Sequence, residues 1–233
     1  MGLIGTYLPF LLKGVLVTIK VTALSAVLAF VMSFVGGLGR LARQRLLRWI
    51  AGAYIELFRG TSLLVQLFWV YYVFPMFGVS VGPFVAGVAV LGLNLGAYGS
   101  EVVRGGIQAV PAGQRDAAVA LDFSPAQRFW RIIMPQAVPL MLPPFGNLLI
   151  VLLKASSLVS LVTLADLTFA ADNLRSTYGH TVLIYGIVLV LYSIMSAILT
   201  AGMRLIEARD AVKYGASIKR RPRLLSDLPG WSP

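Results

Sequence analysis

Long stretches without a charged side chain constrain the fold of this chain more than any other feature. There are four of them, at residues 21–39, 60–100, 135–153 and 181–203. A helix that crosses the roughly 30 Å hydrocarbon core of a bilayer needs about 20 apolar residues. Pro75, Gly78, Gly82 and Pro83 interrupt the second stretch, which therefore predicts two spans. The sequence predicts an all-α integral membrane protein with five transmembrane helices, at about 15–39, 58–78, 83–102, 135–154 and 180–204.

The composition excludes several other classes of protein. Hydrophobic residues make up 58% of the 233 residues and charged residues 12%, which is too apolar for an ordinary soluble domain. Lys13 and Lys20 lie inside the first apolar region and no small-residue cleavage pattern ends it, so we expect a retained span rather than a signal peptide. The chain has no cysteine and a single histidine, His180, so we expect no disulfide and no metal site.

Lysine and arginine are unevenly distributed among the predicted connections. Cytoplasmic loops carry an excess of these residues. Basic clusters follow the first, third and fifth spans, whereas the 78–82 connection is uncharged and the segment after the fourth span balances two basic against two acidic residues, Asp166 and Asp172. We therefore expect the amino terminus outside and the carboxyl terminus in the cytoplasm. The net charge of +11 then reflects topology and contact with anionic lipid, and we expect no nucleic-acid partner.

The segment at residues 111–134 is polar and carries the clearest local signals in the chain. Pro111 suits the start of a helix, and residues 112–121 are rich in alanine. Asp122 falls where this helix should end. The Ser-Pro-Ala-Gln sequence at 124–127 matches a capping box that begins a second helix. Two short helices at an angle would form a compact cytoplasmic unit.

This predicted unit has an apolar side and a basic side. Its arginines, Arg115, Arg128 and Arg131, are expected to face water or a partner. Docking to a cytoplasmic protein is the favoured use, and a helix that lies on the membrane surface is the alternative.

The sequence DAAVALDFSPAQRFWRIIMP at 116–135 resembles the coupling loop of ABC-importer permeases. The family pattern is Glu-Ala-Ala, three residues, Gly, nine residues, Ile, one residue, Leu-Pro, and its spacing is intact here. Asp116, Asp122 and Met134 replace the Glu, Gly and Leu of the pattern. Asp122 stands at the position expected to be left-handed, which aspartate tolerates at a cost of about 1 kcal/mol.

Three other stretches resemble the polar amino-acid subfamily of these permeases. They are ELFRGTSLLVQLFWVYY at 56–72, NLGAYGSEVVRGGIQAVPAGQ at 94–114 and LLKASSLVSLVTLADL at 152–167. The resemblance covers roughly residues 14–209 and implies the type I ABC importer permease fold, with a permease domain at about 1–210 and a basic cytoplasmic tail at 211–233. PPFGNLL together with LVSLVTLADLTFAADNLR is most similar to permeases for ectoine and hydroxyectoine, which are zwitterionic compatible solutes.

The resemblance also implies partners and a location. They are cytoplasmic ABC ATPase subunits, a second permease subunit that is identical or homologous, an extracytoplasmic solute-binding protein and the lipid of the bacterial inner membrane. The chain has no phosphate-binding loop of the G-x-x-x-x-G-K-[ST] type. We therefore expect a subunit that is not an enzyme and binds no cofactor, with ATP-Mg on the ATPase subunit.

The expected ATPase contacts lie in the coupling loop. The predicted coupling residues are Arg115, Asp116, Ala117, Ala118, Asp122, Phe123, Ser124, Phe129, Ile132 and Pro135. Phe123, Phe129 and Trp130 are candidate anchors, because desolvated aromatic side chains often dominate interface energies. Packing of the same rings against the spans is an equal alternative.

Polar side chains at membrane depth are costly, so each is a candidate for the solute pathway or for a contact between helices. The candidates are Gln66, Tyr72, Asn94, Tyr98, Glu101, Asn147, Lys154 and Ser156. Asn94, Tyr98 and Glu101 share one face of the third span, whereas Lys154 lies near the outer end of the fourth, so a single compact pocket is not expected. Hydrogen bonding between helices is the alternative for Asn94 and Gln66, and cytoplasmic ion pairs are the alternative for Glu101.

The predicted function is that of the channel-forming subunit of an ATP-driven importer for a polar amino acid or a related zwitterion. A stand-alone secondary transporter is the alternative, but it would need no capped cytoplasmic loop with the importer spacing. A membrane-embedded enzyme would need convergent catalytic groups, and no such group is visible in the sequence.

Overall fold

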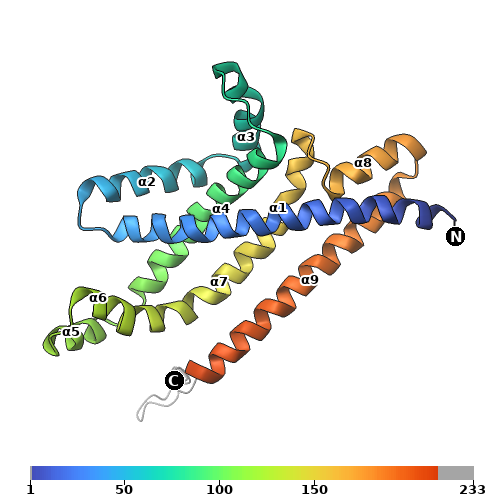
Figure 1. Ribbon diagram of the computed structural model, residues 1–233. Helices are drawn as coiled ribbons and strands as arrows, with labels where there is room; N and C mark the ends of the chain where they lie inside the picture. The colour runs from blue at the N-terminus through green and yellow to red at the C-terminus, as the bar shows by residue number, and fades with distance from the viewer. Residues whose placement is uncertain (1, 215–233) are drawn as a thin grey trace, which may run out of the picture.

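The computed structural model describes residues 2–214 as helices and connections, with no strand in that range (Figure 1). The basic run at 219–223 lies outside the described residues. In chain order the elements are α1 (Gly2–Leu41), α2 (Arg45–Gly60), α3 (Leu63–Phe68), η1 (Trp69–Val73), η2 (Phe74–Phe77), α4 (Pro83–Gln108), α5 (Ala112–Ala120), α6 (Pro125–Gln127), η3 (Arg128–Ile133), α7 (Met134–Ala155), η4 (Ser156–Val162), α8 (Leu167–Tyr178) and α9 (Thr181–Tyr214).

Four helical stretches of the described chain are long and apolar enough to cross a membrane. They are Tyr7–Leu41, Pro83–Gln108, Pro125–Val162 and Thr181–Ala208. Each contains one of the predicted spans and extends beyond it, because the helix continues through polar residues that lie outside the apolar run. α9, for example, ends at Tyr214 rather than near residue 204.

The predicted second span, at 58–78, is not one straight helix. The helical stretches Arg45–Gly60 and Leu63–Phe77 meet at an angle of 103°. The described chain has five spans only if this bent pair counts as one of them. Thr61 and Ser62 at the break have extended backbone conformations. The sequence-based prediction therefore has to be corrected here, because a continuous apolar run does not require a continuous helix.

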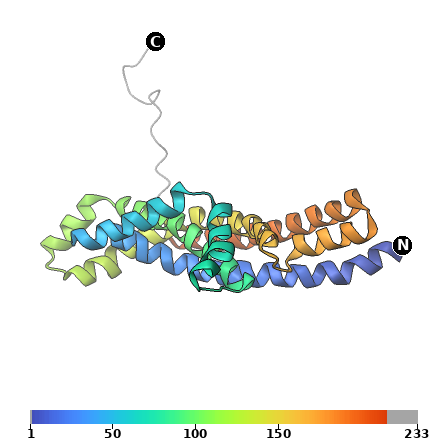
Figure 2. The ribbon, with the colours of Figure 1, turned by 90° about the horizontal axis from the view of Figure 1, so that it is seen from above.

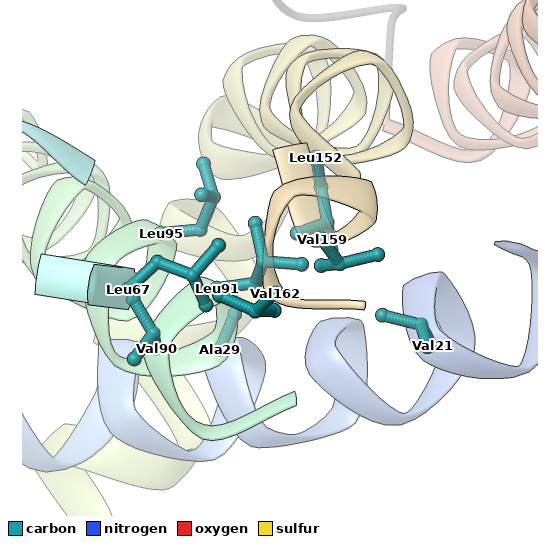
Figure 3. Close-up of a cluster of buried hydrophobic side chains, with 9 residues drawn as sticks. All are labelled: Val21, Ala29, Leu67, Val90, Leu91, Leu95, Leu152, Val159 and Val162. Atoms are coloured by element: carbon teal, nitrogen blue, oxygen red, sulfur yellow. The ribbon is translucent and has the colours of Figure 1, made fainter. Parts of the chain in front are cut away.

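The core lies where α1 crosses α4, with α3, α7 and η4 closing around it. Figure 3 shows side chains from all five elements pointing toward one another. Close approach of α1 and α4 depends on glycine, because a Cβ on Gly92 would lie 2.7 Å from the side chain of Leu28. A small residue at this position therefore lets the two helices pack closely. The buried members of the core are Val21, Ala29, Leu67, Val90, Leu91, Leu95, Leu152, Val159 and Val162.

The bundle is elongated, and its two ends carry different elements. The short helices α5 and α6 and the C-terminal part of α9 lie toward one end, and α8 and the start of α1 lie toward the other (Figures 1 and 2). A second hydrophobic cluster joins α1, α8 and α9 at the α8 end, and Tyr7, Leu11, Leu167 and Ile184 are fully buried in it. The segment predicted to dock a cytoplasmic protein is thus separated from α8 by the length of the bundle.

Candidate functional site

In the polar segment at 111–134, the first helix and the turn that follows it form as the sequence predicts. α5 covers Ala112–Ala120, and Asp122 has a φ of 56°, as expected for the residue that replaces the glycine of the pattern. The Asp122 N–H donates to the Val119 carbonyl at 2.9 Å and the Phe123 N–H donates to the Ala118 carbonyl at 3.0 Å. This pair of bonds is the Schellman arrangement that satisfies the last carbonyls of a helix. The left-handed turn is therefore retained without glycine.

The second helix begins with the predicted capping box. Ser124 Oγ accepts from the Gln127 N–H at 3.3 Å, and Gln127 Oε1 accepts from the Ser124 N–H at 3.0 Å. However, this second helix is not short. It continues through η3 into α7, so that Pro125–Val162 is one helical span. The prediction of two separate short helices is wrong in this respect, because the helix runs on through Pro135 and the later prolines of α7.

Arg115 is bonded within the chain rather than turned toward water or a partner. Its Nη2 donates to the carbonyl of Ile107 at 2.6 Å and to that of Val110 at 3.4 Å. These carbonyls lie at the C-terminal end of α4, where helix carbonyls lack intrahelical partners and attract cations. Arg115 therefore ties α5 to α4, and the expected orientation of its side chain is corrected.

The aromatic residues of the segment divide into two groups. Phe129 is half-buried and packs against a cluster around Val103, Ile107 and Met141. Trp130 is 67% exposed, with its ring at 5.1 Å from that of Phe129. Sequence reasoning left both placements open for these rings, and only the tertiary packing separates the inward ring from the outward one.

Asn94 and Gln66 meet at the break between α2 and α3. Asn94 Nδ2 donates to the Phe58 carbonyl at 2.8 Å and to Gln66 Oε1 at 3.0 Å, and Gln66 Nε2 donates to the same carbonyl at 3.0 Å. Thr61 Oγ1 donates to the Leu57 carbonyl at 2.7 Å. These side chains replace the backbone donors that the break removes. Both amide side chains therefore make hydrogen bonds between helices, which was the alternative to a place in the solute pathway.

Glu101 and Tyr98 lie farther along α4. Arg104 donates to Glu101 from Nε at 2.9 Å and from Nη2 at 2.6 Å, and Arg59 of α2 stands 5.3 Å from the centre of the Tyr98 ring. Glu101 is thus held in a local ion pair with Arg104, which was the alternative to a place in the solute pathway. Tyr72 lies elsewhere, in η1, where its hydroxyl donates to the Leu161 carbonyl at 3.1 Å.

Lys154 lines a cavity that contains several polar side chains. The cavity has a volume of about 680 Å³ and opens between α7 and α9. Its polar side chains are Lys154, Ser157, Tyr185, Tyr192, Ser193 and Ser196. Ser156 is not part of this lining set and is fully buried, with its hydroxyl bonded to the Leu153 carbonyl at 2.7 Å.

Sequence reasoning missed the α9 side of this cavity. The signal was present, because residues 185, 189, 192, 193 and 196 recur at three- and four-residue spacing on one helix face. Hydroxyl groups are so common in spans that this stripe was not distinguished from ordinary packing. The residues predicted for the pathway therefore do not converge on one site. Gln66 and Asn94 lie at the α2–α3 break, Tyr98 and Glu101 lie on α4, and Tyr72 lies on η1. Of the predicted residues, Lys154 lines the α7–α9 cavity.

Asp166 is a buried ionisable group that lies outside the spans. Its side chain is fully buried and caps α8, with Oδ1 accepting from the Phe169 N–H at 2.9 Å. Burial raises its pKa to about 6, although hydrogen bonds from the backbone N–H groups of Phe169 and Thr168 oppose this rise. The exposed Asp172 instead pairs with Arg175 at 2.8 Å.

Comparison with known proteins connects this architecture to a family. The family model described as the binding-protein-dependent transport system inner membrane component matches residues 26–210. A probable amino-acid ABC transporter permease protein of Sinorhizobium fredii is 49% identical over an alignment of 208 residues that covers 87% of this chain and 87% of its own. An L-cystine transport system permease protein of Bacillus subtilis is 35% identical over 83% of this chain and 86% of its own length.

Solved structures agree on the fold. The crystal structure of an amino acid ABC transporter with histidines contains a chain that superposes with a TM-score of 0.84 at 36% identity, covering 88% of this chain and 96% of its own. An inward-facing MetNI methionine ABC transporter gives a TM-score of 0.71 at 22% identity, over 87% of this chain and 96% of its own, and supports the fold alone.

Permease subunits of this kind are non-catalytic inner-membrane proteins, and a separate subunit hydrolyses ATP. The helical bundle and the match over most of the chain lead to one assignment. This chain belongs to the family of binding-protein-dependent transport system inner membrane components and is an ABC transporter permease subunit with the type I fold.

Proposed function

We propose that this chain forms, with a second permease subunit, the translocation path of an ATP-driven importer for a polar amino acid. The relatives support the solute class, since their names specify amino acids in general, L-cystine and arginine. The observation that carries the proposal concerns residues 111–134, which we call the coupling segment. It exposes Trp130 and Leu121, and its helix α5 is bonded to the end of α4 through Arg115.

The segment is built to pass motion into the spans. Arg115 bonds α5 to the end of α4, and η3 joins α6 to α7 without a break. A push on the segment is therefore applied directly to α4 and α7. Closure of ATPase subunits on ATP would move these helices as rigid bodies and alternate the path between inward-open and outward-open states. The predicted coupling residues, from Arg115 to Pro135, would form or support the ATPase contact.

The solute would pass through the cavity between α7 and α9. An amino acid needs a cation for its carboxylate and acceptors or aromatic faces for its ammonium group. Lys154 supplies the cation, and among the described side chains, those of residues 7–208, no ion pair occupies it. Tyr185 and Tyr192 supply aromatic faces and hydroxyl groups. The residues at the α2–α3 break and on α4 would shape the path rather than bind the solute.

The proposed orientation puts the coupling segment and the C-terminal end of α9 in the cytoplasm, and α8 and the amino terminus outside. The basic clusters after the first, third and fifth predicted spans support it. α8 would then face the solute-binding protein, which we propose as the external partner. The second permease subunit is either a copy of this chain or a homologue of it.

The narrower proposal concerns ectoine and hydroxyectoine. Both are compact zwitterions, and the cavity combines a lysine with tyrosine faces that suit a carboxylate and a delocalised cation. Binding measurements on the external binding protein, with ectoine against glutamine and arginine, test this proposal. Binding of amino acids alone would overturn the ectoine proposal and leave the amino-acid proposal in place.

Uptake by proteoliposomes tests the main proposal. The permease, its ATPase and its binding protein are reconstituted, and labelled amino acid is offered outside with ATP or a non-hydrolysable analogue inside. Import that requires ATP hydrolysis and the ATPase subunit supports the proposal. Uptake by the permease alone, driven by a proton or sodium gradient, would overturn it in favour of a secondary transporter.

A further inference from the structure

Asp166 lies where α1, α8 and α9 meet, at the α8 end of the bundle. It caps α8, its Oδ2 accepts from the Tyr192 hydroxyl of α9 at 3.4 Å, and the neighbouring Leu167 N–H donates to Thr18 Oγ1 of α1 at 3.1 Å. Thr168 and Tyr192 also share a hydrogen bond of 3.3 Å. We refer to Asp166, Thr168, Tyr192 and Thr18 as the α8 anchor. Asp166 and Thr18 are both fully buried.

The backbones of α1 and α8 are also in close contact beside Asp166. A Cβ on Gly14 of α1 would lie 2.8 Å from the Leu167 Cα and 2.9 Å from the Asp166 carbonyl oxygen. Such distances essentially never occur for a real Cβ, so α8 can approach α1 only because residue 14 is glycine. Tyr192 in turn lines the α7–α9 cavity. One side chain therefore belongs both to the cavity wall and to the support of α8.

We infer that Asp166 is a positioning residue that fastens α8 to α1 and to the wall of the α7–α9 cavity, so that release of α8 and rearrangement of the cavity are coupled. The Asp166 carboxyl group is not a lining group of the cavity and acts through Tyr192, which is one. The geometry of the contacts supports the fastening, and its meaning for transport rests on the proposed function. The fastening itself does not depend on the identity of the solute.

Protonation of Asp166 gives this role a distinctive signature. The groups that contact its carboxyl are the Tyr192 phenol from α9 and the Thr168 hydroxyl from α8, and the Thr18 hydroxyl of α1 is bonded to the neighbouring Leu167 N–H. Lys154, Asp172 and Arg175 lie on exposed or half-exposed surface. Docking raises the pKa of the carboxyl from 3.8 to about 6. A raised acid pKa means that the docked state binds the proton more tightly, so docking is strongest below about pH 4 and weakens as the pH rises to about 6.

The test measures how often α8 opens. Because the chain contains no cysteine, a single Ala171→Cys on the buried face of α8 reports opening by its rate of labelling with a pyridyl disulfide, which reacts even at acid pH. The rate is divided by that of Asn173→Cys, on the exposed face of the same helix, to remove the intrinsic effect of pH on thiols. The measurement uses the permease assembled with its ATPase in proteoliposomes.

We expect the normalised rate of the parent to rise on the order of 100-fold between pH 4 and pH 6.5, from the shift of about two pKa units. Asp166→Asn, which stays neutral and can still cap α8, should abolish this rise and remain slow. Tyr192→Phe should label faster at every pH. A parent with a flat profile, or an Asp166→Asn variant that titrates like the parent, would overturn the inference.

Two glycine variants separate this role from a general loss of structure. Gly14→Ala should open α8 at every pH by steric conflict, while keeping the pH dependence. Gly186→Ala, on α9 with nothing within 4 Å of its Cβ position, should match the parent. Equal effects of both would show that labelling reports global unfolding and would also overturn the inference. Because labelling needs no transported solute, failure here leaves the proposed import function untouched.

Discussion

Two individual residues, Lys154 and Asp122, occupy positions that are unfavourable for their residue types. Lys154 is an exposed lysine in a span, a location that normally costs free energy. It becomes intelligible because it lines a cavity with four hydroxyl-bearing side chains of α9. Asp122 similarly adopts a φ of 56°, which suits glycine better than aspartate.

Replacement of Lys154 tests the proposed contact with the solute carboxylate. We expect Lys154→Gln to raise the KM for uptake by about 10- to 100-fold, because a hydrogen bond to a charged group contributes about 1.5–3 kcal/mol. Uptake kinetics in proteoliposomes provide the measurement. Lys20→Gln, at another exposed lysine in a span, is the control and should leave the KM unchanged. An equal effect of both variants would point to surface charge instead.

Replacement of Asp122 tests the left-handed turn. Asp122→Gly should raise the stability of the permease by about 1 kcal/mol and Asp122→Ala should lower it by about 1 kcal/mol, because only glycine enters this conformation without steric cost. Thermal unfolding of the purified protein in detergent gives the order of stability. If alanine proves as stable as glycine, the turn is not under the strain described.

At the scale of elements, the break between α2 and α3 depends on side chains from α4. The bend of 103° leaves the Phe58 carbonyl without a backbone donor from its own helix. Asn94 and Gln66 provide two donors to it. A polar group buried without a partner costs about 1–3 kcal/mol, so these amides hold the bend in place.

Asn94→Leu should therefore lower the free energy of unfolding by about 1–3 kcal/mol. The matched control is Asn147→Leu, on the exposed face of α7, which should change it by less than about 0.5 kcal/mol. Denaturant or thermal unfolding in the same detergent compares the two. Similar losses in both would mean that any amide at membrane depth is stabilising.

The coupling segment is the other element with a distinct surface. Trp130→Ala should weaken association with the ATPase by about 2 kcal/mol or more, as for a central aromatic anchor, and should uncouple ATP hydrolysis from uptake. Trp49, which is 71% exposed on α2, offers a matched control, and Trp49→Ala should retain coupling. Co-purification and ATPase assays give the readout. Normal assembly of the Trp130 variant would exclude this ring as an anchor.

At the scale of the whole molecule, the two ends should face different compartments. With no cysteine in the chain, Asn173→Cys on α8 and Ala126→Cys on α6 can each be labelled specifically. We expect a membrane-impermeant maleimide to label Asn173→Cys in intact cells, and to label Ala126→Cys only after permeabilisation. The reverse pattern would invert the proposed orientation.

The sequence by itself determined the features that depend on local chemistry. Uncharged runs identified four long spans, because a helix in the hydrocarbon core needs about 20 apolar side chains, but they did not reveal the bend between α2 and α3. The capping box at Ser124 and the left-handed Asp122 were also predictable, since each is set by residues three to five positions apart. The coupling segment, the most specific part of the candidate site, was visible for this reason.

Only the tertiary structure decided the features that join distant residues. The bend at Thr61 is stabilised by Asn94, the inward turn of Arg115 depends on the end of α4, and the cavity combines Lys154 with residues of α9. Apolar patterning shows that a helix enters the membrane but not which neighbour its polar side chains will meet. That choice follows from packing between helices, where a single glycine such as Gly14 determines how closely two elements approach.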